Sequence, residues 1–286
     1  MNKQLLSTVV ALVMAASAVG AELHTDVEYA VVAPSSASGS NDGESLKLDV
    51  SVPEGEGPFP IAILVHGGGW SSGDKSQVHV PPTKRLTDKF TWFSIDYRLA
   101  PAHHWPACID DVRQAIRWVK AHAAEYKGDP QRIAVIGYSA GGHLAAFAAV
   151  TAKQDTKVQA AVILAGPTFL LADCERRGQV SPALQALFDR GPELDNAARG
   201  ILRNASPVSN LYGDLPPFLL IHGTLDESVL YSQSENFQAL LNELNFPCEI
   251  VTIPGAGHNI RAWKMFDPNY EQKMVDWLHK TLSSDQ

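Results

Sequence analysis

Cysteine is scarce in this sequence, and its spacing excludes the common cysteine-based sites. The 286 residues include three cysteines, Cys108, Cys174 and Cys248, and none of them belongs to a C-x-x-C pair. This excludes a thioredoxin-like redox motif and a zinc ribbon. The histidines are scattered apart from His103 and His104, so we predict no metal site. Three cysteines permit one disulfide, but the sequence does not select the pair.

Basic clusters and long apolar stretches are missing as well. The formal net charge is −8, and no run of lysine and arginine is present that would bind nucleic acid or an anionic membrane. Beyond the N-terminus, no apolar run reaches the length of a membrane span. Hydrophobic residues make up 45% of the chain, which at this length is enough for one large core. We therefore expect one globular domain, residues 22–286, with no nucleic-acid partner. The oligomeric state stays open.

Residues 1–21 have the composition of a secretory signal peptide. Lys3 supplies a positive charge, an apolar run covers residues 5–13, and small residues mark a cleavage site after Ala21. The shortness of the apolar run favours cleavage over retention as an anchoring helix. We therefore expect a secreted or periplasmic protein that has no membrane contact after cleavage.

Runs of strand length alternate with helical patterns along the rest of the chain. Residues 27–32 and 46–52 are expected to form an antiparallel edge, because the second of these runs alternates apolar and polar residues. Apolar runs, typical of strands covered on both faces, follow at 61–65, 91–95, 133–136, 160–164 and 218–221, with a last strand at 249–253. Helical patterns cover residues 107–126, 143–152, 231–244 and 269–282. The alternation predicts an α/β fold with a mostly parallel central sheet and helices on both faces.

One segment, residues 166–216, interrupts this alternation. It contains no strand pattern and two short helical patterns, at residues 182–188 and 193–202. It is too long for a plain loop, and it connects two core strands. We therefore expect a small helical cap above the carboxyl ends of the strands, where open α/β sheets bind ligands. Its apolar residues are expected to face the site, the body or one another: Phe169, Leu170, Leu184, Leu187 and Phe188.

The most informative motif is the G-x-S-x-G stretch of residues 137–141. An apolar, β-branched run precedes it and a small-residue helical pattern follows, which is the strand–turn–helix context of a nucleophile elbow. A serine on so tight a turn has its hydroxyl exposed, and the flanking glycines let strand and helix approach each other. The motif therefore predicts Ser139 as a catalytic nucleophile.

A serine hydroxyl needs a base, and that base needs a carboxylate to orient it. Asp226 follows the strand at 218–221 and is our candidate acid, with Glu227 and Asp214 as weaker alternatives and with helix capping as its structural alternative. His258 stands in a Gly/Pro loop after the last strand and is the candidate base. His143 is not chosen, because it falls inside the helix, where we expect it to pack or pair. His222 is likewise discounted.

Two further sets of residues are assigned around these three. The amide of Ala140 and one amide of the 66–70 loop, Gly68 in preference to Gly67, are expected to form an oxyanion hole. Arg98 is expected to pair with a carboxylate such as Asp96 or Asp111. Four aromatic side chains near the motifs are candidates for lining the pocket, with plain core packing as the alternative: Trp70, Trp105, Tyr138 and Trp263.

These motifs resemble those of the α/β-hydrolase superfamily over nearly the whole mature chain. Residues 66–75, 97–101 and 137–144 are similar to the esterases related to hormone-sensitive lipase, and closer to the bacterial feruloyl and acetyl-xylan esterase-like branch. The resemblance implies ester hydrolysis through an acyl-enzyme without a cofactor. It places Ser139, Asp226 and His258 on triad positions, and Gly67, Gly68 and Ala140 on oxyanion positions. One departure is Tyr138, which stands where the hormone-sensitive-lipase-like enzymes usually carry aspartate.

The sequence thus predicts a serine carboxylesterase for short-acyl esters. On the resemblance, these are acetyl or feruloyl esters of plant polysaccharide. The alternatives are an exopeptidase or amidase with the same triad, and a non-catalytic binding protein on the same fold. The exopeptidase lacks support, because no propeller domain and no evident acidic pair for a peptide amino terminus are present.

Overall fold

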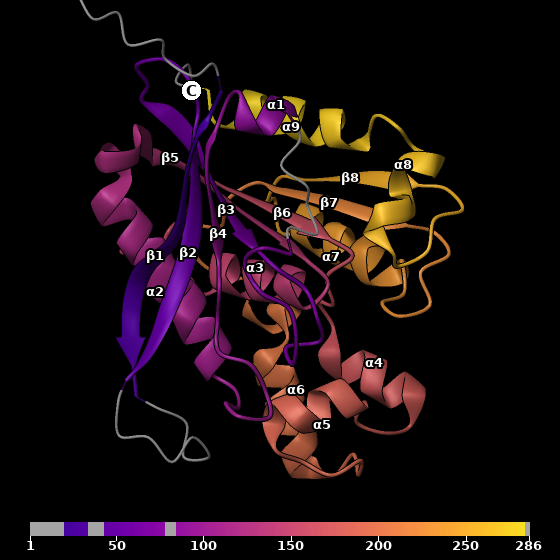
Figure 1. The fold of residues 1–286 in the computed structure, drawn as a ribbon. Helices are drawn as coiled ribbons and strands as arrows, with labels where there is room; N and C mark the ends of the chain where they lie inside the picture. Colours follow the sequence, from indigo (N-terminus) through magenta and orange to yellow (C-terminus); the bar gives the residue numbers. More distant parts are fainter. Residues whose placement is uncertain (1–19, 34–42, 78–83, 284–286) are drawn as a thin grey trace, which may run out of the picture.

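The central feature of the molecule is an eight-stranded, mostly parallel sheet, seen in a computed structural model that describes residues 20–33, 43–77 and 84–283 (Figure 1). The strands are β1 (Glu22–Val32), β2 (Glu44–Val52), β3 (Phe59–Val65), β4 (Thr91–Ile95), β5 (Gly128–Tyr138), β6 (Ala160–Leu164), β7 (Phe218–Gly223) and β8 (Cys248–Ile253). Their order is β1-β2-β4-β3-β5-β6-β7-β8, and only the β1–β2 and β2–β4 pairs are antiparallel. The predicted fold class is confirmed. The predicted signal peptide lies outside the described residues except for its last two.

The helices are α1 (Lys84–Thr87), α2 (Ala107–His122), α3 (Ala140–Val150), α4 (Leu170–Arg177), α5 (Pro182–Phe188), α6 (Asn196–Ala205), α7 (Ser232–Glu243), α8 (Trp263–Phe266) and α9 (Tyr270–Thr281). Short 3₁₀ turns lie at Ala123–Tyr126, Pro207–Asn210 and Ile260–Ala262. No helix of the described ranges is both long and apolar enough to cross a bilayer.

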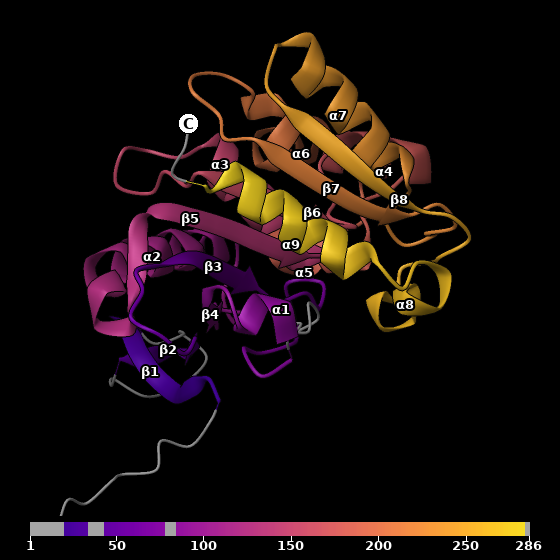
Figure 2. The same ribbon diagram turned by 90° about the horizontal axis from the view of Figure 1, so that it is seen from above.

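Two apolar layers cover the sheet. On one face, buried residues of α2, α3 and α7 pack together with those of α4, α5 and α6. On the other face, α1, α8 and α9 form a smaller cluster, and Figure 2 shows α9 lying across the sheet. α3 is buried on every side, which explains its run of alanine and glycine: larger side chains would hold it away from the strands.

The strand register brings the carboxyl ends of the parallel strands to one edge. Val65 at the end of β3 pairs with Ile95 of β4 and with Gly137 of β5. Gly223 pairs with Ile253 at the ends of β7 and β8. Loops that follow these strands therefore meet at the same edge, although they are far apart in the sequence.

The segment of residues 166–216, called the helical segment from here on, contains three α-helices rather than the two that its sequence predicts. α5 has the predicted bounds and α6 overlaps the pattern predicted at 193–202, whereas α4 was missed. Only Leu170 and Cys174 are buried in α4, and that single apolar pair is too short a signal to define a helical period. The three helices gather at the lower right of Figure 1 and share their apolar residues with the main core.

All three cysteines are buried free thiols, so the disulfide left open by the sequence is not present. Cys108 lies in α2, Cys174 in α4 and Cys248 at the start of β8. Burial raises the pKa of Cys108 and of Cys248 to about 12 and raises that of Cys174 as well.

Candidate active site

Ser139 occupies a strained turn between β5 and α3. Its φ is 54° and its ψ is −120°, a backbone conformation that residues other than glycine rarely adopt. Its amide donates to the carbonyl of Leu164 at the end of β6 (2.9 Å), which holds the turn against the sheet. A Cβ at Gly137 or Gly141 would collide with neighbouring backbone atoms, so the two glycines of the motif are required by close approach.

Three side chains from three loops form one line of hydrogen bonds. The hydroxyl of Ser139 lies 2.9 Å from Nε2 of His258, and Nδ1 of His258 lies 2.6 Å from Oδ2 of Asp226. A carboxylate only accepts, so Nδ1 carries the proton, and in the neutral ring Nε2 is then free to accept from the serine. Asp226 is buried, while the side chain of His258 is 23% exposed. The base therefore sits between a buried carboxylate and an accessible hydroxyl.

The second carboxylate oxygen of Asp226 has a different role. Oδ1 accepts from the amides of Ser228 and Val229, each at 2.9 Å. These two amides belong to the turn before α7, whose N-cap is Tyr231 and carries no side-chain cap, so Asp226 orders this turn and does not cap the helix as the alternative required. The weaker acid candidates lie elsewhere: Asp214 pairs with Lys157 on the surface, and Glu227 is exposed.

His222, which the sequence analysis discounted, is part of this arrangement. It is fully buried, and its Nε2 lies 2.9 Å from the carbonyl of Val229 and 3.2 Å from Oδ2 of Asp226. Both partners accept, so Nε2 carries the proton and Nδ1 accepts from the hydroxyl of Ser234 (2.8 Å). The signal was available: a four-residue spacing to Asp226 across a tight turn at a strand end brings the ring onto the carboxylate.

The hydrogen bonds on Asp226 set its charge state. Burial alone would raise the pKa of this carboxyl, but hydrogen bonds from His222, His258 and the Val229 amide outweigh burial and hold the pKa well below its usual range. Asp226 is therefore an anion at neutral pH, where it favours a positive charge on the neighbouring imidazole.

The glycine loop after β3 lies against the serine. A Cβ at Gly67 would contact the Cβ of Ser139, and Gly68 has a φ of +114°, which only glycine adopts readily. In the part of the chain that the structure describes, no hydrogen bond is donated by the amides of Gly67, Gly68 or Ala140. These are the amides predicted for an oxyanion hole, and of the three residues Ala140 lines the cavity at Ser139.

The four aromatic side chains predicted near the pocket have different positions in the structure. Trp70 lines the cavity beside Ser139, whereas the other three do not, and their assignment to the pocket is corrected here. The Tyr138 hydroxyl donates to the carbonyl of His258, and the two rings stack, so this tyrosine supports the histidine loop. Trp263 is fully buried and donates to the carbonyl of Gly257 at 2.8 Å. Trp105 packs against Phe147 and Phe188.

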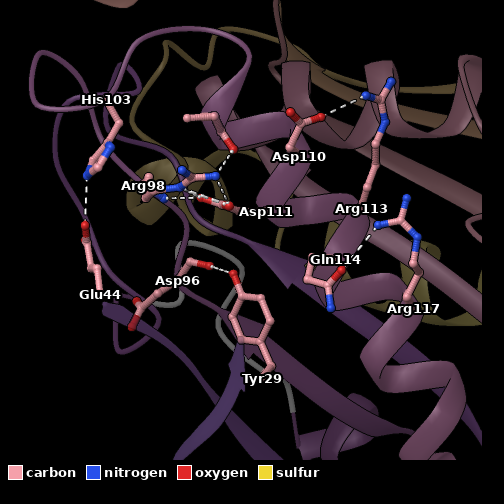
Figure 3. A network of polar contacts seen from close by, with 11 residues as sticks. Tyr29, Glu44, Asp96, Arg98, His103, Asp110, Asp111, Arg113, Gln114 and Arg117 are labelled. Carbon is pink, nitrogen blue, oxygen red and sulfur yellow. Dashed lines mark hydrogen bonds and ion pairs between the residues drawn. The ribbon is translucent and has the colours of Figure 1, made fainter. Parts of the chain in front are cut away.

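Buried polar contacts hold the loops around the site. His143 accepts from the indole N–H of Trp70 at Nδ1 (3.2 Å) and donates to the carbonyl of Ala205 from Nε2 (2.8 Å). Arg98 donates to both oxygens of Asp111, at 2.8 and 2.6 Å, and so ties the loop after β4 to α2 (Figure 3). Each of these two residues pairs as the sequence predicted.

The cavity at Ser139 has a volume of about 160 Å³. Its lining combines the carboxyl edge of the sheet with residues from the helical segment: Gly69, Trp70, Ser139, Ala140, Pro167, Leu170, Asp173, Arg177, Ser181, Ala183, Leu184, Ser228, Val229 and His258. Of the five apolar residues expected to face the site, the body or one another, Leu170 and Leu184 line the cavity. Phe169 lines a neighbouring cavity, Leu187 is buried in the core, and Phe188 packs on Trp105. Across the described ranges, no cluster of three or more acidic, histidine or cysteine side chains could hold a metal ion.

The fold and this line of side chains define an α/β hydrolase with a serine, a histidine and an aspartate at the carboxyl edge of its sheet. The BD-FAE family model matches residues 48–241, more than half of the chain, and the chain belongs to the BD-FAE family. The predicted resemblance to esterases related to hormone-sensitive lipase is confirmed.

Individual proteins agree with this assignment. The probable carboxylic ester hydrolase LipM of Mycobacterium tuberculosis is 35% identical over 202 residues, covering 66% of this chain and 46% of LipM. Esterase LipC of the same organism is 34% identical over 224 residues, covering 70% of this chain and 53% of LipC. The chain therefore spans about half the length of the curated relatives it matches. A solved truncated form of a carbohydrate esterase from gut microbiota has a TM-score of 0.74 at 26% identity, covering 92% of this chain and 96% of that one.

Proposed function

We propose that this protein is a serine carboxylesterase that hydrolyses short-acyl esters, and that Ser139, His258 and Asp226 are its catalytic triad. The observation that carries the proposal is the continuous hydrogen-bond line from the Ser139 hydroxyl through His258 to Asp226, at the wall of a cavity. The names of similar proteins, carboxylic ester hydrolase and carbohydrate esterase, support an ester as the substrate.

In the first step, Ser139 Oγ attacks the carbonyl carbon of the ester while His258 Nε2 takes the hydroxyl proton. The new imidazolium is stabilised by the Asp226 anion, and the carbonyl oxygen becomes an oxyanion. The amides of Ala140 and of Gly68 or Gly67 donate to that oxygen. The bond to the alcohol oxygen then breaks, the alcohol takes the proton from His258, and an acyl-serine remains.

A water molecule completes the cycle by the same route. His258 takes a proton from water as it attacks the acyl carbon, and the proton returns to Ser139 when the carboxylic acid leaves. His258 must be neutral to accept a proton in either step.

The cavity volume supports a small acyl group. At about 160 Å³ it lies below the range of roughly 300–1,000 Å³ that is typical of pockets for drug-sized ligands. An acetyl group fits this size better than a feruloyl group does. We propose acetyl esters as the preferred class, and the similarity to a carbohydrate esterase supports a sugar as the alcohol.

We also propose that the protein is exported, because residues 1–21 have the pattern of a signal peptide.

The test is a steady-state assay of the full chain with p-nitrophenyl acetate, p-nitrophenyl butyrate, methyl ferulate and the amide p-nitroacetanilide. The proposal expects turnover of the esters, fastest for acetate, and labelling of Ser139 by a phosphonate inhibitor. Faster cleavage of the amide than of the esters would favour an amidase instead. Absence of turnover with a correctly folded protein would leave a binding protein on a hydrolase fold.

A further inference from the structure

Two charged residues of α4 line the same cavity as the catalytic side chains. Asp173 and Arg177 lie one turn apart on this helix, and the Arg177 Nε donates to Asp173 Oδ2 at 2.7 Å. Their side chains are 17% and 33% exposed, respectively. Both residues line a cavity whose other lining residues from the helical segment are mainly apolar: Pro167, Leu170, Ala183 and Leu184.

The position of Arg177 is held by a contact with the loop of the catalytic acid. Its Nη2 donates to the carbonyl of Ser228 at 3.1 Å, and the amide of Ser228 donates to Asp226. These contacts use two of the five N–H groups of the guanidinium, and Arg177 forms no other hydrogen bond with the described residues. The group is thus fixed in orientation and keeps donors for a ligand.

The acyl half and the alcohol half of an ester differ in the hydrogen-bonding groups that they present to such a cavity. A short acyl group has no hydrogen-bonding atom besides the carbonyl oxygen, and that oxygen is directed to the amides near Ser139. A donor and an acceptor elsewhere in the wall therefore serve the alcohol half. An adjacent carboxylate and guanidinium provide both functions, which suits a hydroxyl group because it donates and accepts at once.

We propose that Arg177, together with Asp173, selects esters whose alcohol half carries further hydroxyl groups, as a sugar does. This inference rests on the proposed esterase function and assigns its alcohol specificity to one pair of residues. Arg177 donates to a hydroxyl oxygen beside the scissile ester, and Asp173 accepts from a hydroxyl hydrogen.

The experiment compares two acetates with a six-membered ring in the alcohol. One is methyl β-xyloside carrying a single acetyl group, and the other is cyclohexyl acetate, which has no further hydroxyl. For Arg177→Met, which keeps most of the apolar stem, kcat/KM on the xyloside acetate is expected to fall about 10- to 100-fold, as for loss of a hydrogen bond to a charged group. The value on cyclohexyl acetate should stay within about 3-fold, since that alcohol makes no such contact.

Arg176 offers a matched control. It lies next to Arg177 on α4 and donates to the other oxygen of the same aspartate, at 2.7 Å, but it lines a neighbouring cavity without catalytic residues. Arg176→Met also removes one positive charge and one contact to Asp173, and it should leave both acetates unaffected. Arg177→Lys keeps a charge and a donor without the planar fork, so it should recover part of the selectivity.

The outcomes separate the two proposals. If the wild-type protein hydrolyses neither acetate, the esterase function itself is wrong. If it hydrolyses both and Arg177→Met lowers both equally, Arg177 only ties α4 to the acid loop, and the inference is overturned. It is also overturned if the loss appears on methyl ferulate instead of on the xyloside acetate, because the pair would then contact the acyl half.

Discussion

The sheet edge and the helical segment contribute to the same cavity in different ways. Ser139, Asp226 and His258 stand on turns directly after strands whose register is fixed by backbone hydrogen bonds. Residues of α4 and α5 reach the cavity as side chains of short helices that are held by apolar packing. The sheet edge therefore supplies reactive groups in a geometry that tolerates little change, whereas the helical segment supplies walls that substitutions can reshape. If this division is correct, changes in the two regions will affect different kinetic constants.

The largest effect is expected from the sheet edge, at Ser139. Removing its hydroxyl by Ser139→Ala removes the proposed nucleophile and should lower kcat by roughly 10⁴-fold or more on every ester. Stopped assays with p-nitrophenyl acetate measure this loss, and circular dichroism shows whether the variant is folded. Near-normal turnover by the folded variant would disprove the assignment of Ser139.

Substitutions of the other two residues of the proposed triad should lower kcat by different amounts. His258→Ala should cost about as much as the serine variant, because the two residues act as a unit, while Asp226→Asn should lower kcat by a factor on the order of 10² to 10⁴. Asp214→Asn serves as the control, since that carboxylate is on the surface. If Asp214→Asn loses activity while Asp226→Asn keeps it, Asp214 is the catalytic acid and the assignment of Asp226 is wrong.

Within the helical segment, a smaller and selective effect is expected. Leu184→Ala removes an apolar wall of the cavity, so the ratio of kcat/KM for butyrate to that for acetate should rise about 10-fold, the range of one or two methylene groups in a pocket. Leu187→Ala is the matched control on the same helix, because this residue is fully buried and does not line the cavity. It should lower stability and leave the ratio unchanged. Equal shifts in both variants would contradict the division between the two regions.

The last expected effect concerns stability rather than turnover, at His143, which joins the two regions through its contacts with Trp70 and Ala205. Burial lowers the pKa of His143 to about 4, against 6.5 for the unfolded chain. Between these values the unfolded state binds the proton and the folded state does not, so this residue makes stability fall as the pH drops from 6.5 towards 4. At pH 5 the loss relative to pH 8 is about 2 kcal/mol.

Urea titrations of the wild type and of His143→Gln at pH 8 and pH 5 measure how much unfolding free energy His143 removes at low pH. The variant is expected to show less loss of unfolding free energy between the two pH values, whatever its stability at pH 8. An identical loss in both proteins would mean that His143 does not titrate in this way.

The sequence predicts the sheet edge better than it predicts the helical segment. Strands β4 and β6 begin and end where the apolar runs predict, and the serine, acid and base candidates meet at the sheet edge, because strand–turn spacing is a local signal. α4 was missed because its contacts with α6 and with the acid loop are tertiary. Tyr138 and Trp263 were misplaced because sequence proximity to a motif does not determine on which side of a loop an aromatic ring lies.

The buried thiols give this molecule its own reporters of local unfolding. A buried thiol with a raised pKa reacts with a labelling reagent mainly after the surrounding structure opens. Cys174 lies in the helical segment, while Cys108 and Cys248 lie in α2 and β8. The labelling rate at Cys174 relative to that at Cys108 therefore measures the free energy by which the wall of the cavity opens while the sheet stays closed.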